Sequence, residues 1–124
     1  MTITKLNPVD SGWKTLQLSN DVLAYDSNNA PRYRKVDGIV FIDGAAKPAA
    51  AAEANAVLVI GTLPVGYRPE KEHLTIMQGS VQAIWLLRVL SNGNVRCERY
   101  RNGSTAAAMS TTTWLPCTTE FVAG

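Results

Sequence analysis

The chain has 124 residues, of which 46% are hydrophobic, and this size and composition suit one domain with a single core. Its 12 basic and 10 acidic residues leave a net charge of +2, which is too small to favour nucleic acid as a partner. The N-terminal residues lack the apolar stretch of a signal peptide, and no apolar run approaches the roughly 20 residues that span a bilayer, so we expect no membrane insertion.

Residues 1–12 are predicted to be a lead-in or linker, because Asn7, Pro8 and residues 10–12 are of turn-forming types. The domain proper is expected to span residues 13–124. Its first strands flank a turn-rich loop at residues 26–31, and Trp13 is predicted to pack in the core.

Residues 32–44 are rich in β-branched and aromatic residues, with Asp37-Gly38 in the middle, and they predict a hairpin or a long bulged strand. The alanine-rich residues 45–56 have no apolar stripe, so we expect a loop or one loose helical turn there. A strand that is apolar on both faces follows at residues 56–61.

Further strands are predicted at residues 73–77, 81–90 and 95–100, with Asn92-Gly93 at the centre of a primed hairpin turn between the last two. Strict alternation in the return strand would place Val95, Cys97 and Arg99 on one face, and it would place Arg96, Glu98 and Tyr100 on the other. A final strand is expected around residues 119–122. Short strands at this spacing predict a single all-β domain, an antiparallel β-sandwich of jelly-roll-like or barrel-like form.

Three of the predicted strands, at residues 39–42, 57–60 and 83–87, are apolar at every position. Both faces of such strands must be covered. One explanation is a homo-oligomer in which Ile84, Leu86 and Leu90 meet another subunit. The alternative is that long loops such as residues 45–56 fold over the outer face.

No constellation of catalytic residues is recognisable in the sequence. His73 is the only histidine, and no serine lies in a nucleophile elbow. Cys97 and Cys117 have neither metal-ligand spacing nor the density of a disulfide-stapled domain, so we expect free core thiols rather than a bridge. We therefore predict no enzyme, no metal and no cofactor.

A weaker alternative is a glycoside hydrolase with a pair of carboxylates. The candidate acids are Asp37, Asp43, Glu98 and Glu120.

Aromatic and cationic residues are better candidates for a binding site. Arg99, Tyr100 and Arg101 lie at a hairpin end, where an aromatic ring and guanidinium donors suit a sugar or a protein loop, and Tyr33 and Arg34 form a similar group. The alternative is a polar strand end with solvated arginines.

The other two tryptophans are assigned from their neighbours. Trp85 shares a strand face with apolar residues and is expected in the core. Trp114 is expected either in the core or at its rim.

The string LPVGYRP at residues 63–69, after an apolar strand, resembles the LPxGYRP signature of β-sandwich modules in the tail fibres, baseplates and receptor-binding proteins of tailed phages. RKVDGIVFIDG at residues 34–44 and VLSNGNV at residues 89–95 resemble the strand pair and the hairpin that flank it in that group. Trp13 and Trp114 complete the order, so the resemblance covers nearly the whole chain.

The resemblance implies a virion protein of the tail or baseplate, made in the cytoplasm of a bacterial host. It further implies a homotrimer that contacts a host cell-surface saccharide or protein, together with other virion tail proteins as partners. A purely structural tail module is the alternative. The residues of the signature suit a strand exit and carry no binding role that can be transferred.

Overall fold

The computed structural model describes residues 9–124, so residues 1–8 of the predicted lead-in lie outside the described part. The described chain is almost entirely β-strand, with one short 3-10 turn, η1 (Ser27–Asn29). The strands are β1 (Lys14–Thr15), β2 (Gln17–Leu18), β3 (Val22–Ala24), β4 (Arg32–Val36), β5 (Ile39–Asp43), β6 (Ala45–Pro48), β7 (Leu58–Thr62), β8 (His73–Gln78), β9 (Ala83–Val89), β10 (Asn94–Asn102), β11 (Thr105–Ala106), β12 (Leu115–Pro116) and β13 (Thr119–Val122).

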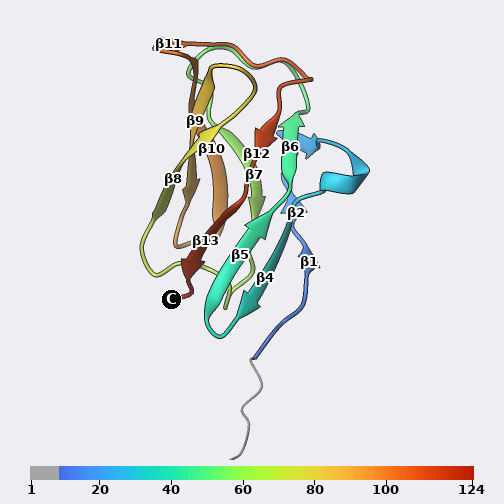
Figure 1. The fold of residues 1–124 in the computed structure, drawn as a ribbon, viewed down its shortest axis with the longest axis vertical. Helices are drawn as coiled ribbons and strands as arrows, with labels where there is room; N and C mark the ends of the chain where they lie inside the picture. Colours follow the sequence, from blue (N-terminus) through green and yellow to red (C-terminus); the bar gives the residue numbers. More distant parts are fainter. Residues whose placement is uncertain (1–8) are drawn as a thin grey trace, which may run out of the picture.

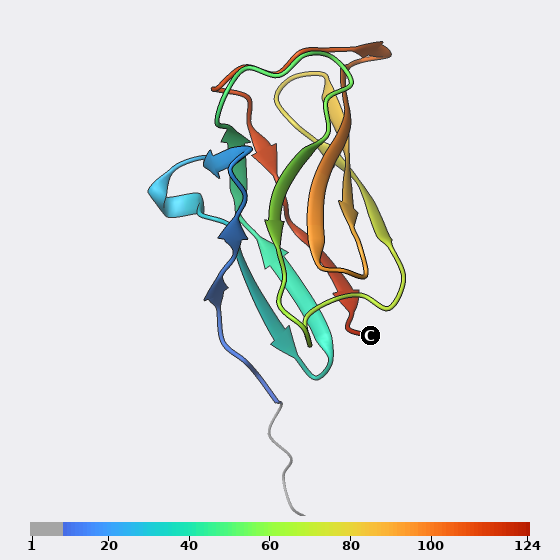
Figure 2. The ribbon, with the colours of Figure 1, turned by 180° about the vertical axis from the view of Figure 1, so that it is seen from behind.

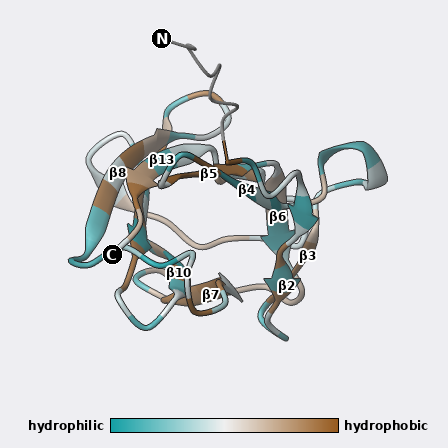
Figure 3. Ribbon diagram, turned by 90° about the horizontal axis from the view of Figure 1, so that it is seen from below, coloured by the Kyte–Doolittle hydropathy of each residue, from teal (hydrophilic) through white to brown (hydrophobic). Residues whose placement is uncertain are grey.

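The strands form two layers, which confirms the predicted antiparallel β-sandwich (Figure 1). The first layer is the sheet β1-β4-β5-β13, here called the β5 sheet, and the small sheet β12-β6-β3 continues it beyond Gly44. The second layer, the β9 sheet, has the order β2-β7-β10-β9-β8, with β11 beside β10. Seen from below, β13, β5 and β4 lie in one layer, while β10 and β7 lie in the other (Figure 3).

The two edges of the sandwich are joined differently. At one edge the chain itself crosses between the layers (Figure 2), since β1 pairs with β4 and β2 pairs with β7. Leu16, between β1 and β2, is buried. At the other edge side chains join β8 to β13. Thr119 Oγ1 lies 2.8 Å from His73 Nε2 and 2.9 Å from Thr75 Oγ1, both within hydrogen-bond distance.

The core between the layers confirms some of the assignments from sequence. Trp85 is 1% exposed and lies in the core, as predicted. Cys97 and Cys117 are buried free thiols, and burial raises the pKa of each to about 12. Trp114 lies at the rim, with 38% of its surface exposed.

The prediction that Trp13 packs in the core is wrong, because 40% of its surface is exposed. Its ring stacks with arginine side chains on the outside of the β5 sheet instead. A large aromatic ring at the start of a domain has two ways to reduce its contact with water, and the sequence does not distinguish burial from stacking on guanidinium groups.

The alanine-rich segment differs from its prediction over residues 45–48. These residues form β6, which pairs with β12 and β3, and Ala45 and Ala46 are buried. Small side chains suffice for burial where the strand lies between two neighbours, although they provide no apolar stripe that a sequence pattern would show. The rest of the segment is loop, and it is joined to the later chain by a bridge between Ala52 and Met109.

The hairpin between β9 and β10 also differs from its prediction. Among its central residues only Gly93 has a positive φ, 94°, and its N–H donates to the carbonyl of Leu90 at 2.9 Å. This is the geometry of a type I turn followed by a left-handed glycine, not of a primed turn. A Cβ atom at Gly93 would lie 2.4 Å from the Leu63 carbonyl oxygen, so this position also needs glycine for space.

Candidate functional site

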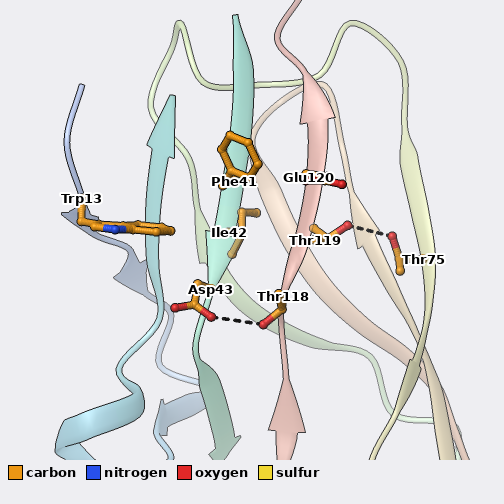
Figure 4. A pocket seen from close by; sticks show the side chains of 8 residues that line it. All are labelled: Trp13, Phe41, Ile42, Asp43, Thr75, Thr118, Thr119 and Glu120. Carbon is orange, nitrogen blue, oxygen red and sulfur yellow. Dashed lines mark hydrogen bonds between the residues drawn. The ribbon is translucent and has the colours of Figure 1, made fainter. Parts of the chain in front are cut away.

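A groove of about 500 Å³ lies on the β5 sheet. Figure 4 shows its lining, which comes from four separate segments: Trp13, β5 and its end, β8, and the residues leading into and along β13. The lining residues are Trp13, Phe41, Ile42, Asp43, Thr75, Thr118, Thr119 and Glu120.

Stacked arginines hold Trp13 at one side of this groove. The guanidinium carbon of Arg32 lies 4.0 Å from the centre of the Trp13 ring, and that of Arg34 lies 5.6 Å from it. Asp43 fixes Arg32 through a contact of 3.0 Å, and Asp10 fixes Arg34 through a contact of 2.8 Å between Oδ1 and Nε. The hydrogen bond from Arg34 lowers the pKa of the Asp10 carboxyl. Trp13 is therefore positioned by two ion pairs.

The other side of the groove is polar. The hydroxyl of Thr118 donates to Asp43 at 3.3 Å, and Thr75 and Thr119 supply further hydroxyls. The side chain of Glu120 is exposed and has no ion pair among residues 9–124. Aromatic surface beside hydroxyl and carboxylate groups suits a ligand with apolar faces and many hydroxyls, which is the chemistry of a saccharide.

Two of the four acids named for a hydrolase come together in the groove, and the other two lie elsewhere. Asp43 and Glu120 both line the groove, whereas Glu98 lies on the β9 sheet and pairs with Arg88 at 2.9 Å. Asp37 lies in the turn between β4 and β5 and accepts a hydrogen bond from the N–H of Val9 at 2.9 Å.

His73 has a structural position at the edge between β8 and β13. Its ring is partly buried beside Phe121, with the ring centres 5.4 Å apart, and burial lowers the pKa of His73. Its Nε2 is occupied by threonine hydroxyls.

A second surface lies on the outer face of the β9 sheet, where a bulge alters the predicted alternation of β10. The register against β9 shifts between Glu98 and Arg101, and Arg99 has a positive φ of 56°. As a result, Arg99 is exposed instead of facing the core with Cys97, while Tyr100 packs against the core. The predicted faces of Arg99 and Tyr100 are therefore wrong, because the extra residue of the bulge exchanges them.

The bulge brings two groups of predicted residues together. Arg99 and Arg101 line a small apolar hollow with Ile76, Ile84 and Leu86, and thus the proposed ligand contacts and the proposed subunit contacts meet at one place. On their other side, Arg99, Tyr100 and Arg101 line a polar hollow of about 220 Å³.

Leu86 is only 7% exposed, so it is largely covered within one chain. Leu90 is partly buried just beyond the end of β9.

The remaining predicted binding residues are already engaged. Tyr33 is 8% exposed, and its ring makes an edge contact with Tyr67 at 5.0 Å between centres. Arg34 is held by Asp10 and Trp13. The stack around Trp13 was not predicted from the sequence. The register of the β4–β5 hairpin places Arg32 opposite Asp43, and such a cross-strand ion pair can be predicted once the hairpin is recognised.

Residues 63–69 form a strand exit. The Nε of Arg68 donates to the Leu63 carbonyl at 2.8 Å, which closes the segment on itself. Tyr67 packs against the core. These contacts are those of a scaffold element.

Residues 9–124 contain no cluster of three or more histidine, cysteine or acidic side chains that suits a metal ion. None of the helical structure in that range is long and apolar enough to cross a membrane.

No protein-family model matches the sequence, and no curated protein sequence matches it. Among solved structures, the fold is similar to the head domain of phage bIL170, described in a study of the receptor-binding domains of lactococcal phages. The TM-score is 0.63 with 15% sequence identity, and the match covers 90% of this chain and 97% of that one. At this identity the likeness establishes the fold, an all-β sandwich shared with a phage receptor-binding head domain.

Proposed function

We propose that this domain is a receptor-binding part of a tailed phage or prophage virion, located in its tail fibre or baseplate, and that it contacts a saccharide on the host cell surface. The observation that carries the proposal is the match over 90% of the chain to a phage receptor-binding head domain. The groove on the β5 sheet supports this proposal, because its lining suits a saccharide.

The groove supports a sugar ligand by its chemistry. Trp13 and Phe41 offer apolar surface, and their neighbours offer hydroxyl and carboxylate groups for hydrogen bonds. Because the two ion pairs already hold the Trp13 ring, a ligand need not order it on binding. Of the hydrolase candidates only Asp43 and Glu120 line the groove, and Asp43 is already paired with Arg32 at 3.0 Å, which favours binding over turnover.

The test is adsorption of the purified domain to candidate bacterial host cells and to a glycan array. Trp13→Ala is expected to weaken binding about 5- to 10-fold, the equivalent of one lost aromatic contact. Trp114→Ala is a matched control, because Trp114 has nearly the same exposure, 38% against 40%, but lies outside the groove. Equal losses in both variants would place the site elsewhere, and a domain that adsorbs to no cell and no glycan would refute the proposal.

The exposed apolar side chains of β8 favour a second role in assembly. Leu74 and Ile76 are 51% and 66% exposed on the outer face of the β9 sheet, beside Ile84. Such a stripe suits a contact with further copies of the chain, as a homotrimer, or with another tail protein.

Light scattering of the purified domain measures this assembly role. We expect a trimeric mass that Ile76→Lys reduces to that of a monomer, with Lys71→Glu as an exposed control just before β8. A monomer at all concentrations would remove the trimer. Co-purification with a neighbouring tail protein, without any host binding, would favour the purely structural module.

A further inference from the structure

Arg99 stands in a backbone conformation that glycine adopts with least strain. Its φ is 56°, in the left-handed region, and it is the extra residue that bulges from β10 opposite β9. An arginine there reduces the stability of the fold relative to glycine. The presence of arginine at this position therefore calls for a contribution from its side chain.

Folding does not use that side chain as an ion-pair partner. Neither Arg99 nor Arg101 forms an ion pair within residues 9–124, and both are exposed. Glu98, the nearest carboxylate along β10, is already taken by Arg88 at 2.9 Å, and Arg88 also holds Glu72 at 2.7 Å. The bulge thus presents two guanidinium groups with no acid to neutralise them.

The two arginines border a hollow with polar walls. Its volume is about 220 Å³, and Asn55, Tyr100 and Ser104 complete its lining together with Ala106. The volume is below the roughly 300–1,000 Å³ of pockets for drug-sized ligands, so it suits one sugar ring better than an extended peptide. Amide and hydroxyl side chains can bond the hydroxyls of such a ring, while two guanidinium groups suit the paired oxygens of an acid group.

We propose that Arg99 and Arg101 form a binding site for an acidic sugar, one that carries a carboxylate or a phosphate, on the face of the sandwich opposite the Trp13 groove. The site rests on the proposed function in one respect, namely that the ligand is a saccharide of the host surface. It makes the domain a two-faced binder, with an aromatic groove on the β5 sheet and an acid-selective hollow on the β9 sheet.

The test is titration of the purified domain, followed by calorimetry and by amide NMR shifts. The acidic probes are galacturonate and glucose 1-phosphate, their neutral counterparts are galactose and glucose, and further arms use inorganic phosphate and a short oligoglutamate. Each acidic probe that suits the hollow is expected to bind at least 10-fold more tightly than its neutral counterpart, with shifts at Asn55 and Ser104. Binding is also expected to weaken as salt rises.

Variants locate the site. Arg99→Gly and Arg101→Gln are each expected to weaken binding of the acidic probe about 10-fold, whereas Lys71→Gln, which removes an equal charge elsewhere, should change it less than 2-fold. Light scattering of both variants is measured as well, because Arg99 and Arg101 also line the apolar hollow with Ile76 and Ile84. A variant that keeps the wild-type mass and loses affinity assigns the loss to the site.

Three outcomes would overturn the inference. One is equal affinity for acidic and neutral sugars, and another is an unchanged affinity in Arg99→Gly. The third is binding of inorganic phosphate or oligoglutamate as tight as that of the acidic sugar, which would mean an unselective anion site. If the domain adsorbs to cells but does not bind the acidic sugars, the inference of this second site is wrong and the proposed function stands. If it binds the acidic sugars but adsorbs to no cell, the proposed function is wrong.

Discussion

Replacing Arg99 by glycine is expected to make the domain more stable, although most glycine substitutions in strands do the opposite. The left-handed conformation costs an L-residue about 1–2 kcal/mol, and the greater freedom of glycine in the unfolded chain offsets about 0.5–1 kcal/mol of the relief. The Arg99 side chain is exposed and makes no ion pair within residues 9–124, so its removal subtracts little. A net gain of about 0.5–1 kcal/mol corresponds to a rise in Tm of roughly 2–4 °C for a domain of this size.

The assay is thermal and urea unfolding of the wild type and of two variants. Arg101→Gly is the matched control, because it makes the same chemical change two residues away, where the φ is not positive. It is expected to lower stability by about 0.5–1 kcal/mol through the weaker strand propensity of glycine. If Arg99→Gly destabilises the domain as much as Arg101→Gly does, the argument from backbone strain fails.

Three further predictions concern the scaffold. Gly44→Ala is expected to lower stability by about 3 kcal/mol or more, since its φ is 114° and the new Cβ atom would lie 2.8 Å from the backbone of Ala30; an unchanged urea midpoint would contradict this. Burial lowers the pKa of His73 below its ordinary value of 6.5, so the unfolded chain binds a proton that the fold excludes. Stability measured by urea unfolding should therefore be complete above about pH 6.5 and decline below it, and His73→Gln should flatten that decline; a pH dependence that is the same in the variant would exclude His73 as its source. Burial raises the pKa of Cys97 and Cys117 to about 12, so iodoacetamide at pH 8 should modify them only after unfolding, and modification of the native domain within minutes would show that they are reachable.

The fold class and most strands could be predicted because turn residues and alternation are local signals. The strands at residues 73–77 and 95–100 and the burial of Trp85 follow from such signals, and the structure confirms them. The strand Ala45–Pro48 could not be predicted, because the burial of its alanines depends on β3 and β12, which come from distant parts of the chain.

The sites were predicted less well, since they depend on single departures from regular geometry. One extra residue at the Arg99 bulge exchanges the faces of Arg99 and Tyr100, and no pattern in the strand indicates it. Trp13 reaches the groove because Arg32 and Arg34 stack with it, and this contact depends on the pairing of β1 with β4. Tyr33 is buried because Tyr67, far along the chain, covers its ring.

The two edges of the sandwich should differ in how readily they open. The edge at Leu16 is held by the continuous chain. The edge between β8 and β13 is joined by side-chain hydrogen bonds among His73, Thr75 and Thr119, with backbone pairing in residues 9–124 only beyond the strand ends, between Pro69 and Ala123. Local unfolding should therefore start at the second edge, and the amides of β8 should exchange with solvent sooner than those of the central strands. The groove extends from Trp13 to Thr75 and Thr119, so a ligand lying across it would act as a clasp, and slower amide exchange in β8 would report its binding.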